Sequence, residues 1–145
     1  MRGKSVYADS NIFIRPLVSD EDSSSAVASC RRLLSAIENG KVVAYTSTLT
    51  WDEVVYVVRR VLGKADSIQV GEKLQRFPNL RFISVSEDII RAAQKLVSER
   101  EILPRDAIHA ASALSRKVDV LVSDDADFDA IEGVKRESSE AFAPG

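Results

Sequence analysis

The sequence of 145 residues predicts a single α/β domain with a mainly parallel central sheet and helices on both faces. Short runs rich in β-branched residues alternate along the chain with longer segments whose apolar residues recur at helical spacing. The run VLV at 120–122 is apolar throughout, which is typical of a strand buried on both sides of a parallel sheet. No repeat and no long linker divides the chain, so we expect one core that buries roughly two-thirds of the unfolded surface.

The N-terminal part of the chain predicts strands over 4–10 and 41–47, with a helix between them. The piece that follows the first strand, through Pro16, is either a short helix or a loop. The polar stretch 19–25 can supply a helix N-cap. Apolar residues at helical spacing from Ala26 to Ile37 predict a helix that stops at Asn39-Gly40.

The segment TLTWDEVVYVVRRVLG at 48–63 is ambiguous, because its valines favour a strand whereas its length and its arginine-rich end favour a helix. We expect a helix that stops at Gly63. Further helices are expected at 65–76, at 86–100 after a Ser86 cap, and at 103–117 with Pro104 near its start. The remaining strands are expected at 81–85, 118–123 and 134–138.

Composition narrows the class of protein only a little. A net charge of −2 argues weakly against a basic nucleic-acid scaffold, but a nucleic-acid enzyme with an acidic pocket is compatible with it. No apolar run approaches the ~20 residues of a membrane span, and no secretory signal is visible, so a cytoplasmic protein without membrane contact is the default expectation. The single cysteine, Cys30, is expected to be a small buried hydrophobe.

Acidic residues fall where the strands of this fold are expected to end. Asp9 ends the first strand, Glu53 lies one turn into the helix after the second, and Asp106 opens the helix before the fourth. Aspartates at 124, 125, 127 and 129 follow the fourth strand directly. Because sites in open parallel sheets form outside the carboxyl ends of strands, these acids could meet at one edge. Each could equally be a helix cap, a first-turn acid or a turn former, and the residues alone leave both readings open.

Carboxylates that do meet would need a counter-charge. At 4 Å and an effective dielectric near 20, each pair repels by about 4 kcal/mol, so protons or cations must neutralise the cluster. An all-oxygen ligand set favours Mg²⁺ or Mn²⁺, ions that support displacement at phosphorus. The only histidine, His109, makes a zinc site improbable and leaves no evident Ser-His-Asp triad.

Four motifs together resemble the PIN-domain family, especially its stand-alone VapC-type toxins: ADSN (8–11), WDEVVYVVRR (51–60), PRDAIHAASAL (104–114) and LVSDDADFDAIEGVKR (121–136). The resemblance covers essentially the whole chain. It implies a three-layer α/β/α sandwich, with residues 1–145 forming one PIN-like nuclease domain. It also implies a metal-dependent endoribonuclease that uses Mg²⁺ or Mn²⁺, and the toxin of a toxin–antitoxin pair.

The resemblance also assigns roles to residues of this chain. It implies catalytic positions at Asp9, Glu53, Asp106 and Asp125. The same four acids, with Asp127, are the implied metal ligands, and Asn11 and Ser123 are implied supporting residues. Asp124 is an extra acid at a variable position of the family pattern, so whether it also contributes to the site stays open. His109 is expected to be structural or substrate-facing, and Trp51 to pack, with stacking on an RNA base as the alternative.

The implied partners are an RNA substrate, an antitoxin protein that blocks the acidic pocket, and a second copy of the chain in a homodimer. Arginines that flank the acidic motifs are candidates for phosphate contacts, although solvated surface side chains are the simpler reading: Arg15, Arg59, Arg60 and Arg105. The main alternative function is a catalytically weak PIN-like protein-interaction module, which the intact set of acids argues against. A phosphotransfer receiver domain is a distant third, because no phosphoacceptor aspartate and lysine stand convincingly at the required strand ends.

Overall fold

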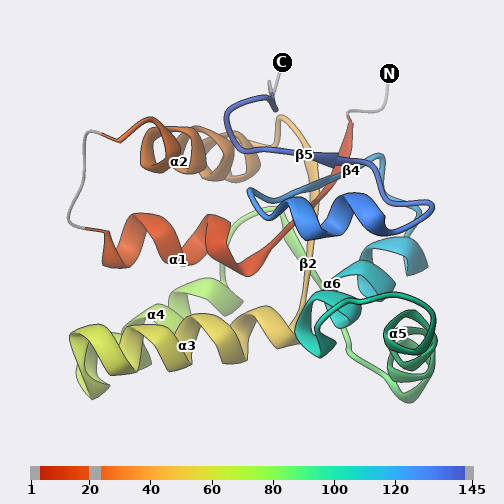
Figure 1. Cartoon of the computed structure of the whole chain (residues 1–145). Helices are drawn as coiled ribbons and strands as arrows, with labels where there is room; N and C mark the ends of the chain where they lie inside the picture. The colour runs from red at the N-terminus through yellow and green to blue at the C-terminus, as the bar shows by residue number, and fades with distance from the viewer. Residues whose placement is uncertain (1–3, 20–23, 143–145) are drawn as a thin grey trace.

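The structure is a computed structural model that describes residues 4–19 and 24–142. Its centre is a five-stranded sheet in the order β3-β2-β1-β4-β5, in which every pairing is parallel. The strands are β1 (Ser5–Ala8), β2 (Val43–Ser47), β3 (Leu80–Ile83), β4 (Val120–Val122) and β5 (Arg136–Glu137). The predicted parallel sheet is therefore confirmed, with β1 at its middle (Figure 1).

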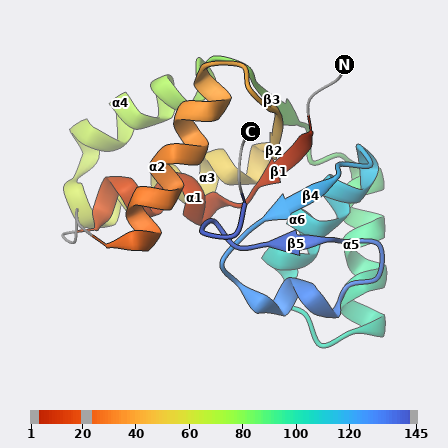
Figure 2. The same cartoon turned by 90° about the horizontal axis from the view of Figure 1, so that it is seen from above.

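Helices cover both faces of the sheet, as Figure 2 shows. The helices are α1 (Ser10–Val18), α2 (Ser25–Glu38), α3 (Thr48–Leu62), α4 (Lys64–Gln75), α5 (Glu87–Glu99) and α6 (Pro104–Ser115), followed by the short 3-10 helix η1 (Ala126–Ala130). Helices α1 to α4 lie on one side of the sheet, and α5, α6 and η1 lie on the other. This arrangement confirms the three-layer α/β/α sandwich.

The alternation of side chains along β1 explains why the sheet needs cover on both faces. Val6 and Ala8 belong to a core formed with α1, α2 and α3, whereas Tyr7, between them, points into a second core formed with α5 and α6. All three side chains are fully buried. The apolar run 120–122 predicted a strand buried on both sides, and β4, next to β1, is indeed buried at all three residues.

The ambiguous segment at 48–63 is a helix, because its burial follows helical spacing. Val54 and Val58, four residues apart, are fully buried, while Tyr56 between them is more than half exposed. Gly63 follows α3 with a φ of 100°, which an L side chain rarely adopts, and lets α4 fold back along α3. Val54 and Val58 thus pack on one face of a helix rather than in a strand.

Several predicted elements differ from the observed ones at their ends, and the predicted first and last strands were too long. The first strand ends at Ala8 rather than at residue 10, since Asp9 caps α1 and Ser10 begins it. The piece through Pro16 is a helix, and Pro16 lies inside it. The last strand has two residues, and η1 was not anticipated. Residues 20–23 of the predicted capping loop lie outside the described residues, but Ser24 does cap α2 through its hydroxyl.

None of the helices within residues 4–19 and 24–142 is long and apolar enough to cross a membrane. Cys30 is fully buried, as expected for a small hydrophobe in α2.

Candidate metal and nuclease site

Asp9 lies at the carboxyl end of the central strand and is almost fully buried. Its Oδ1 accepts a hydrogen bond of 2.8 Å from the Ser10 backbone N–H, and its Oδ2 accepts one of 2.8 Å from the Ser123 hydroxyl. Burial raises the pKa of Asp9, against the opposing effects of His109 and of the Ser123 hydrogen bond. The same carboxylate therefore caps α1 and joins the ends of β1 and β4.

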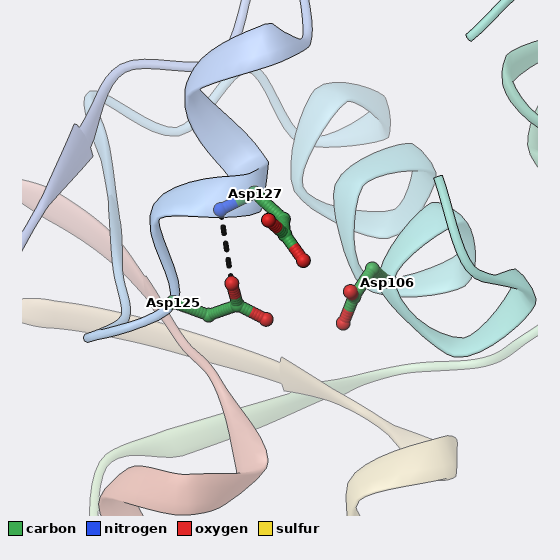
Figure 3. Close-up of side chains that lie close together, drawn as sticks. All are labelled: Asp106, Asp125 and Asp127. Carbon is green, nitrogen blue, oxygen red and sulfur yellow. Dashed lines mark hydrogen bonds between the residues drawn. The ribbon is translucent and has the colours of Figure 1, made fainter. Parts of the chain in front are cut away.

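Three aspartates meet beside this strand end. Asp106 in the first turn of α6, and Asp125 and Asp127 around the start of η1, each offer a carboxylate oxygen within 4.8 Å of the others. Figure 3 shows the three carboxyl groups facing a common space between α6 and η1. Asp125 Oδ1 accepts a hydrogen bond of 2.9 Å from the Asp127 backbone N–H, which fixes the turn that presents both acids.

Within residues 4–19 and 24–142, no basic side chain neutralises the charges of this group by an ion pair. The pKa of Asp106 is raised from 3.8 to about 6, first by burial and then by the neighbouring charges of Asp125 and Asp9. Asp106, Asp125 and Asp127 form no ion pair with a lysine or arginine among the described residues. Such a group is suited to a cation or to a proton.

Glu53 reaches the same region from α3 and is connected to Asp9 by a buried histidine. His109 Nε2 lies 2.6 Å from Glu53 Oε1 and 3.7 Å from Asp9 Oδ1. The other ring nitrogen, Nδ1, lies 2.6 Å from the Tyr7 hydroxyl oxygen. Since His109 is only 1% exposed, it cannot face a substrate in solution, and of the two roles expected for it only the structural one fits this position.

Ser123, at the end of β4, organises two of the acids at once. Its hydroxyl donates to Asp9 Oδ2 and accepts a hydrogen bond of 3.0 Å from the Asp125 backbone N–H. Asn11, the other residue expected to support the site, is exposed on α1 and makes no side-chain hydrogen bond within the described residues. Phe128, from the same turn as the aspartates, is fully buried in the core against α5 and α6.

Asp124 is engaged elsewhere. Its Oδ1 accepts a hydrogen bond of 2.8 Å from the Ser139 backbone N–H, and its Oδ2 accepts one of 3.0 Å from the Ser139 hydroxyl and pairs with Arg15. Partial burial acts to raise the pKa of Asp124, but the hydrogen bonds from Ser139 and Arg15 outweigh it and lower the pKa. Asp124 thus fastens the C-terminal segment to the sheet, which separates it from Asp125.

Other residues of the acidic and basic motifs also have local partners. Asp129 makes a two-point ion pair with Arg136, and this hydrogen bonding lowers the pKa of Asp129. Of the candidate phosphate-binding arginines, Arg15 pairs with Asp124, and the other three are exposed: Arg59, Arg60 and Arg105. The Trp51 indole nitrogen lies 3.1 Å from the position that a Cβ would take on Gly71. This close approach of α3 and α4 favours a packing role for Trp51 over base stacking.

A model of the PIN domain matches residues 6–134. The chain belongs to the PIN domain family. No curated protein sequence gives a significant match.

Solved structures with the same fold include toxins and toxin–antitoxin complexes. VapC20 of Mycobacterium tuberculosis, described as a sarcin-ricin-loop-cleaving toxin, has a TM-score of 0.68 at 18% identity over 86% of this chain and 93% of that one. The DNA-bound VapBC of Salmonella typhimurium has a TM-score of 0.69 at 16% identity, over 94% and 98%. VapBC2 of Rickettsia felis, bound to a promoter fragment, has a TM-score of 0.67 at 19% identity, over 92% and 98%.

The donor set of this PIN domain fits a hard divalent cation. Asp106, Asp125 and Asp127 provide only carboxylate oxygens, the ligands that Mg²⁺ and Mn²⁺ prefer, and the group contains no thiol or imidazole for a softer metal. Asp9 is held close enough to Asp106 for its charge to raise the Asp106 pKa. Glu53 lies beyond His109, so the structure brings the acids together as a compact group of three with two further acids beside it.

Proposed function

We propose that this PIN domain is an endoribonuclease that hydrolyses RNA phosphodiester bonds with a divalent cation, Mg²⁺ or Mn²⁺, held by its carboxylates. The observation that carries the proposal is the meeting of Asp106, Asp125 and Asp127 within 4.8 Å of one another at the carboxyl edge of the sheet. Like charges at this spacing without basic partners are costly, and a cation removes that cost. The family match supports the reaction class.

The acidic residues and Ser123 would have different roles in the reaction. Asp106, Asp125 and Asp127 would hold the cation, with Asp9 and Glu53 completing the acidic edge. Ser123 orients Asp9 and Asp125 through one hydroxyl group, which donates to Asp9 Oδ2 and accepts from the Asp125 backbone N–H. A divalent cation bound there supplies activation of the attacking water and compensation of the charge that develops at phosphorus. Asn11, exposed at the start of α1, is a candidate for a contact with the RNA rather than with the other side chains.

We extend the proposal to the biological setting. Residues 1–145 would act as one nuclease domain in the cytoplasm, as the toxin of a toxin–antitoxin pair. The structural neighbours that are VapBC complexes support an antitoxin partner for this chain. A homodimer is proposed on the family resemblance alone. Two neighbours solved with DNA are VapBC complexes, one of them bound to a promoter fragment, so RNA remains the substrate proposed for the isolated chain.

The alternative is a PIN domain that has lost most of its catalysis and serves as a protein-interaction module. Such a protein has no need to keep mutually repelling carboxylates. Here burial, and after it the charges of Asp125 and Asp9, raise the pKa of Asp106. No lysine or arginine among the described residues offsets this by pairing with the acidic group. The nuclease is therefore the better-supported function.

Cleavage of a labelled pool of single-stranded RNA by the purified protein, with Mn²⁺, with Mg²⁺ or with EDTA, tests the proposal. We expect cutting that depends on metal and that Asp9→Asn abolishes. Asp129→Asn is the matched control, because it removes the same charge from a neighbouring turn position whose partner is Arg136. Metal-independent cutting, or cutting retained in Asp9→Asn, would argue for a contaminating nuclease. Wild-type protein that binds no metal and cuts no RNA would favour the interaction module.

A further inference from the structure

A buried line of hydrogen-bonding groups runs from the core to the acidic edge. It begins at Tyr7 of β1, passes through His109 of α6, and ends at Glu53 of α3. Both contacts are 2.6 Å long. Tyr7 and His109 are 0% and 1% exposed, whereas the Glu53 side chain is 17% exposed. These hydrogen-bonded groups therefore connect the buried core with the acidic site.

Donors and acceptors along this line can be assigned from chemistry. An ionised Glu53 carboxylate only accepts hydrogen bonds, so the proton in the 2.6 Å contact belongs to His109 Nε2. Burial raises the pKa of Tyr7, which keeps its hydroxyl proton in place. Donation of that proton to His109 Nδ1 would place the ring hydrogen on Nε2. This is the tautomer that can donate to the Glu53 carboxylate.

The position of the ring gives this line a consequence for the site. His109 Nε2 lies between acids from two different elements, 2.6 Å from Glu53 and 3.7 Å from Asp9. The hydrogen bond occupies Glu53 Oε1, while Oε2 makes none within the described residues. One oxygen is thus anchored and the other is left for a ligand. The edge-on packing of Tyr7 against His109, with ring centroids 5.7 Å apart, restricts rotation of the imidazole.

We propose that His109 is a positioning residue that fixes the Glu53 carboxylate at the acidic edge, and that Tyr7 sets the orientation and tautomer of His109. The proposal rests on the nuclease function proposed above. It concerns a fixed hydrogen bond and needs no change in the charge of His109. The alternative, that His109 only fills space in the core, predicts that any side chain of similar size would serve as well.

Three variants separate these possibilities. His109→Leu keeps an apolar volume and removes the donor, His109→Gln restores an N–H at the reach of Nε2, and Tyr7→Phe removes only the hydroxyl. We expect His109→Leu to lower kcat by about 10- to 100-fold and to weaken Mn²⁺ binding, with little change in KM. His109→Gln should recover most of the loss. Tyr7→Phe should fall between them while circular dichroism reports an intact fold.

A spectroscopic measurement makes the test independent of activity. His109 is the only histidine in the sequence, so an untagged, ¹⁵N-labelled sample gives one pair of imidazole nitrogen signals. The proposal requires a protonated Nε2 and an unprotonated Nδ1 in wild type, with a displaced Nδ1 signal in Tyr7→Phe. A ring protonated on Nδ1, whether alone or together with Nε2, would overturn the proposal, even if His109→Leu fails to fold.

The outcomes also separate the proposal from the nuclease function. If wild type cuts RNA while a folded His109→Leu keeps its kcat, or if His109→Gln is as impaired as His109→Leu, the positioning role is wrong and the nuclease stands. If wild type cuts no RNA, the nuclease function falls. The nitrogen spectrum and the Mn²⁺ affinity of the variants then still support or refute the positioning of Glu53.

Discussion

Replacing Asp106 by asparagine is expected to stabilise the metal-free protein at neutral pH and to abolish RNA cleavage. Burial, followed by the charges of Asp125 and Asp9, raises the pKa of Asp106 from 3.8 to about 6. The folded protein therefore binds this proton more tightly than the unfolded chain does. The stability that the proton contributes is fully present below about pH 4 and is lost as the pH rises through about 6.

The size of the effect follows from the same pKa. The interval from 3.8 to about 6 corresponds to about 3 kcal/mol, at ~1.36 kcal/mol per pH unit. Asp106 is only partly buried, so solvent screening reduces this to about 2 kcal/mol. The asparagine also gives up a favourable first-turn interaction with the α6 dipole, worth about 0.3–1 kcal/mol. A net gain of about 1 kcal/mol, or roughly 4 °C in Tm, is expected.

Thermal unfolding in EDTA at pH 7.5 and at pH 4 measures the gain. Asp106→Asn should melt at a higher temperature than wild type at pH 7.5, and the advantage should disappear near pH 4, where the wild-type carboxyl group is protonated. Asp129→Asn is the matched control. Because the Arg136 hydrogen bond lowers the Asp129 pKa, its removal should not stabilise the protein at either pH. A less stable Asp106→Asn at pH 7.5, or an equal gain at both pH values, would refute the electrostatic reasoning.

Three further predictions concern the metal, the C-terminal tie and the serine of the site. Adding Mn²⁺ at about 100 times its Kd should raise the free energy of unfolding of wild type by about 2.7 kcal/mol and leave that of Asp125→Asn unchanged. An equal rise in both proteins would mean that the ion binds elsewhere. Asp124→Ala should lower Tm by an amount equivalent to about 1–2 kcal/mol, because it frees the Ser139 donors, while RNA cleavage persists in a fluorescent assay. Ser123→Ala should reduce kcat by about 10- to 100-fold through its contacts with Asp9 and Asp125, and an unaffected kcat would contradict the role given to its hydroxyl.

The layers of the fold could be predicted from the sequence because hydrophobic spacing and strand patterning dictate them. The segment 48–63 shows how. It is too long for one of the short strands of this sheet, and as a helix it buries Val54 and Val58 on one face. The ends of elements were harder to predict. Asp9 and Ser10 were included in the predicted first strand, but the capping hydrogen bond that Asp9 accepts from the Ser10 backbone N–H turns the chain into α1 instead. The strand β5 has only two residues, too few to show an alternation of polar and apolar side chains.

The arrangement of the candidate site could be predicted in part. The rule that parallel strands end at one edge indicated that Asp9, Asp106 and Asp125 would be neighbours. The family resemblance assigned Asp125 and left open whether Asp124 also contributes, because adjacent residues in a turn point in directions set by the backbone. Asp124 instead binds Ser139, fifteen positions away, a contact that no local pattern indicates.

The contact of Tyr7 with His109 likewise could not be predicted from the sequence. It depends on which face of β1 meets α6, and a shift of one residue in that strand would bury the tyrosine in the opposite core. One clue was available, since His109 follows Asp106 by three residues and so shares its face of the helix.

The most direct test of the account is the position of a bound cation. Crystals grown or soaked with Mn²⁺ would be measured at a wavelength where manganese scatters anomalously. The account predicts an anomalous peak among the carboxylates of Asp106, Asp125 and Asp127, absent in crystals of Asp125→Asn treated in the same way. A peak at another place, or none at a Mn²⁺ concentration that supports RNA cleavage, would contradict a carboxylate-held metal site at the edge of the sheet.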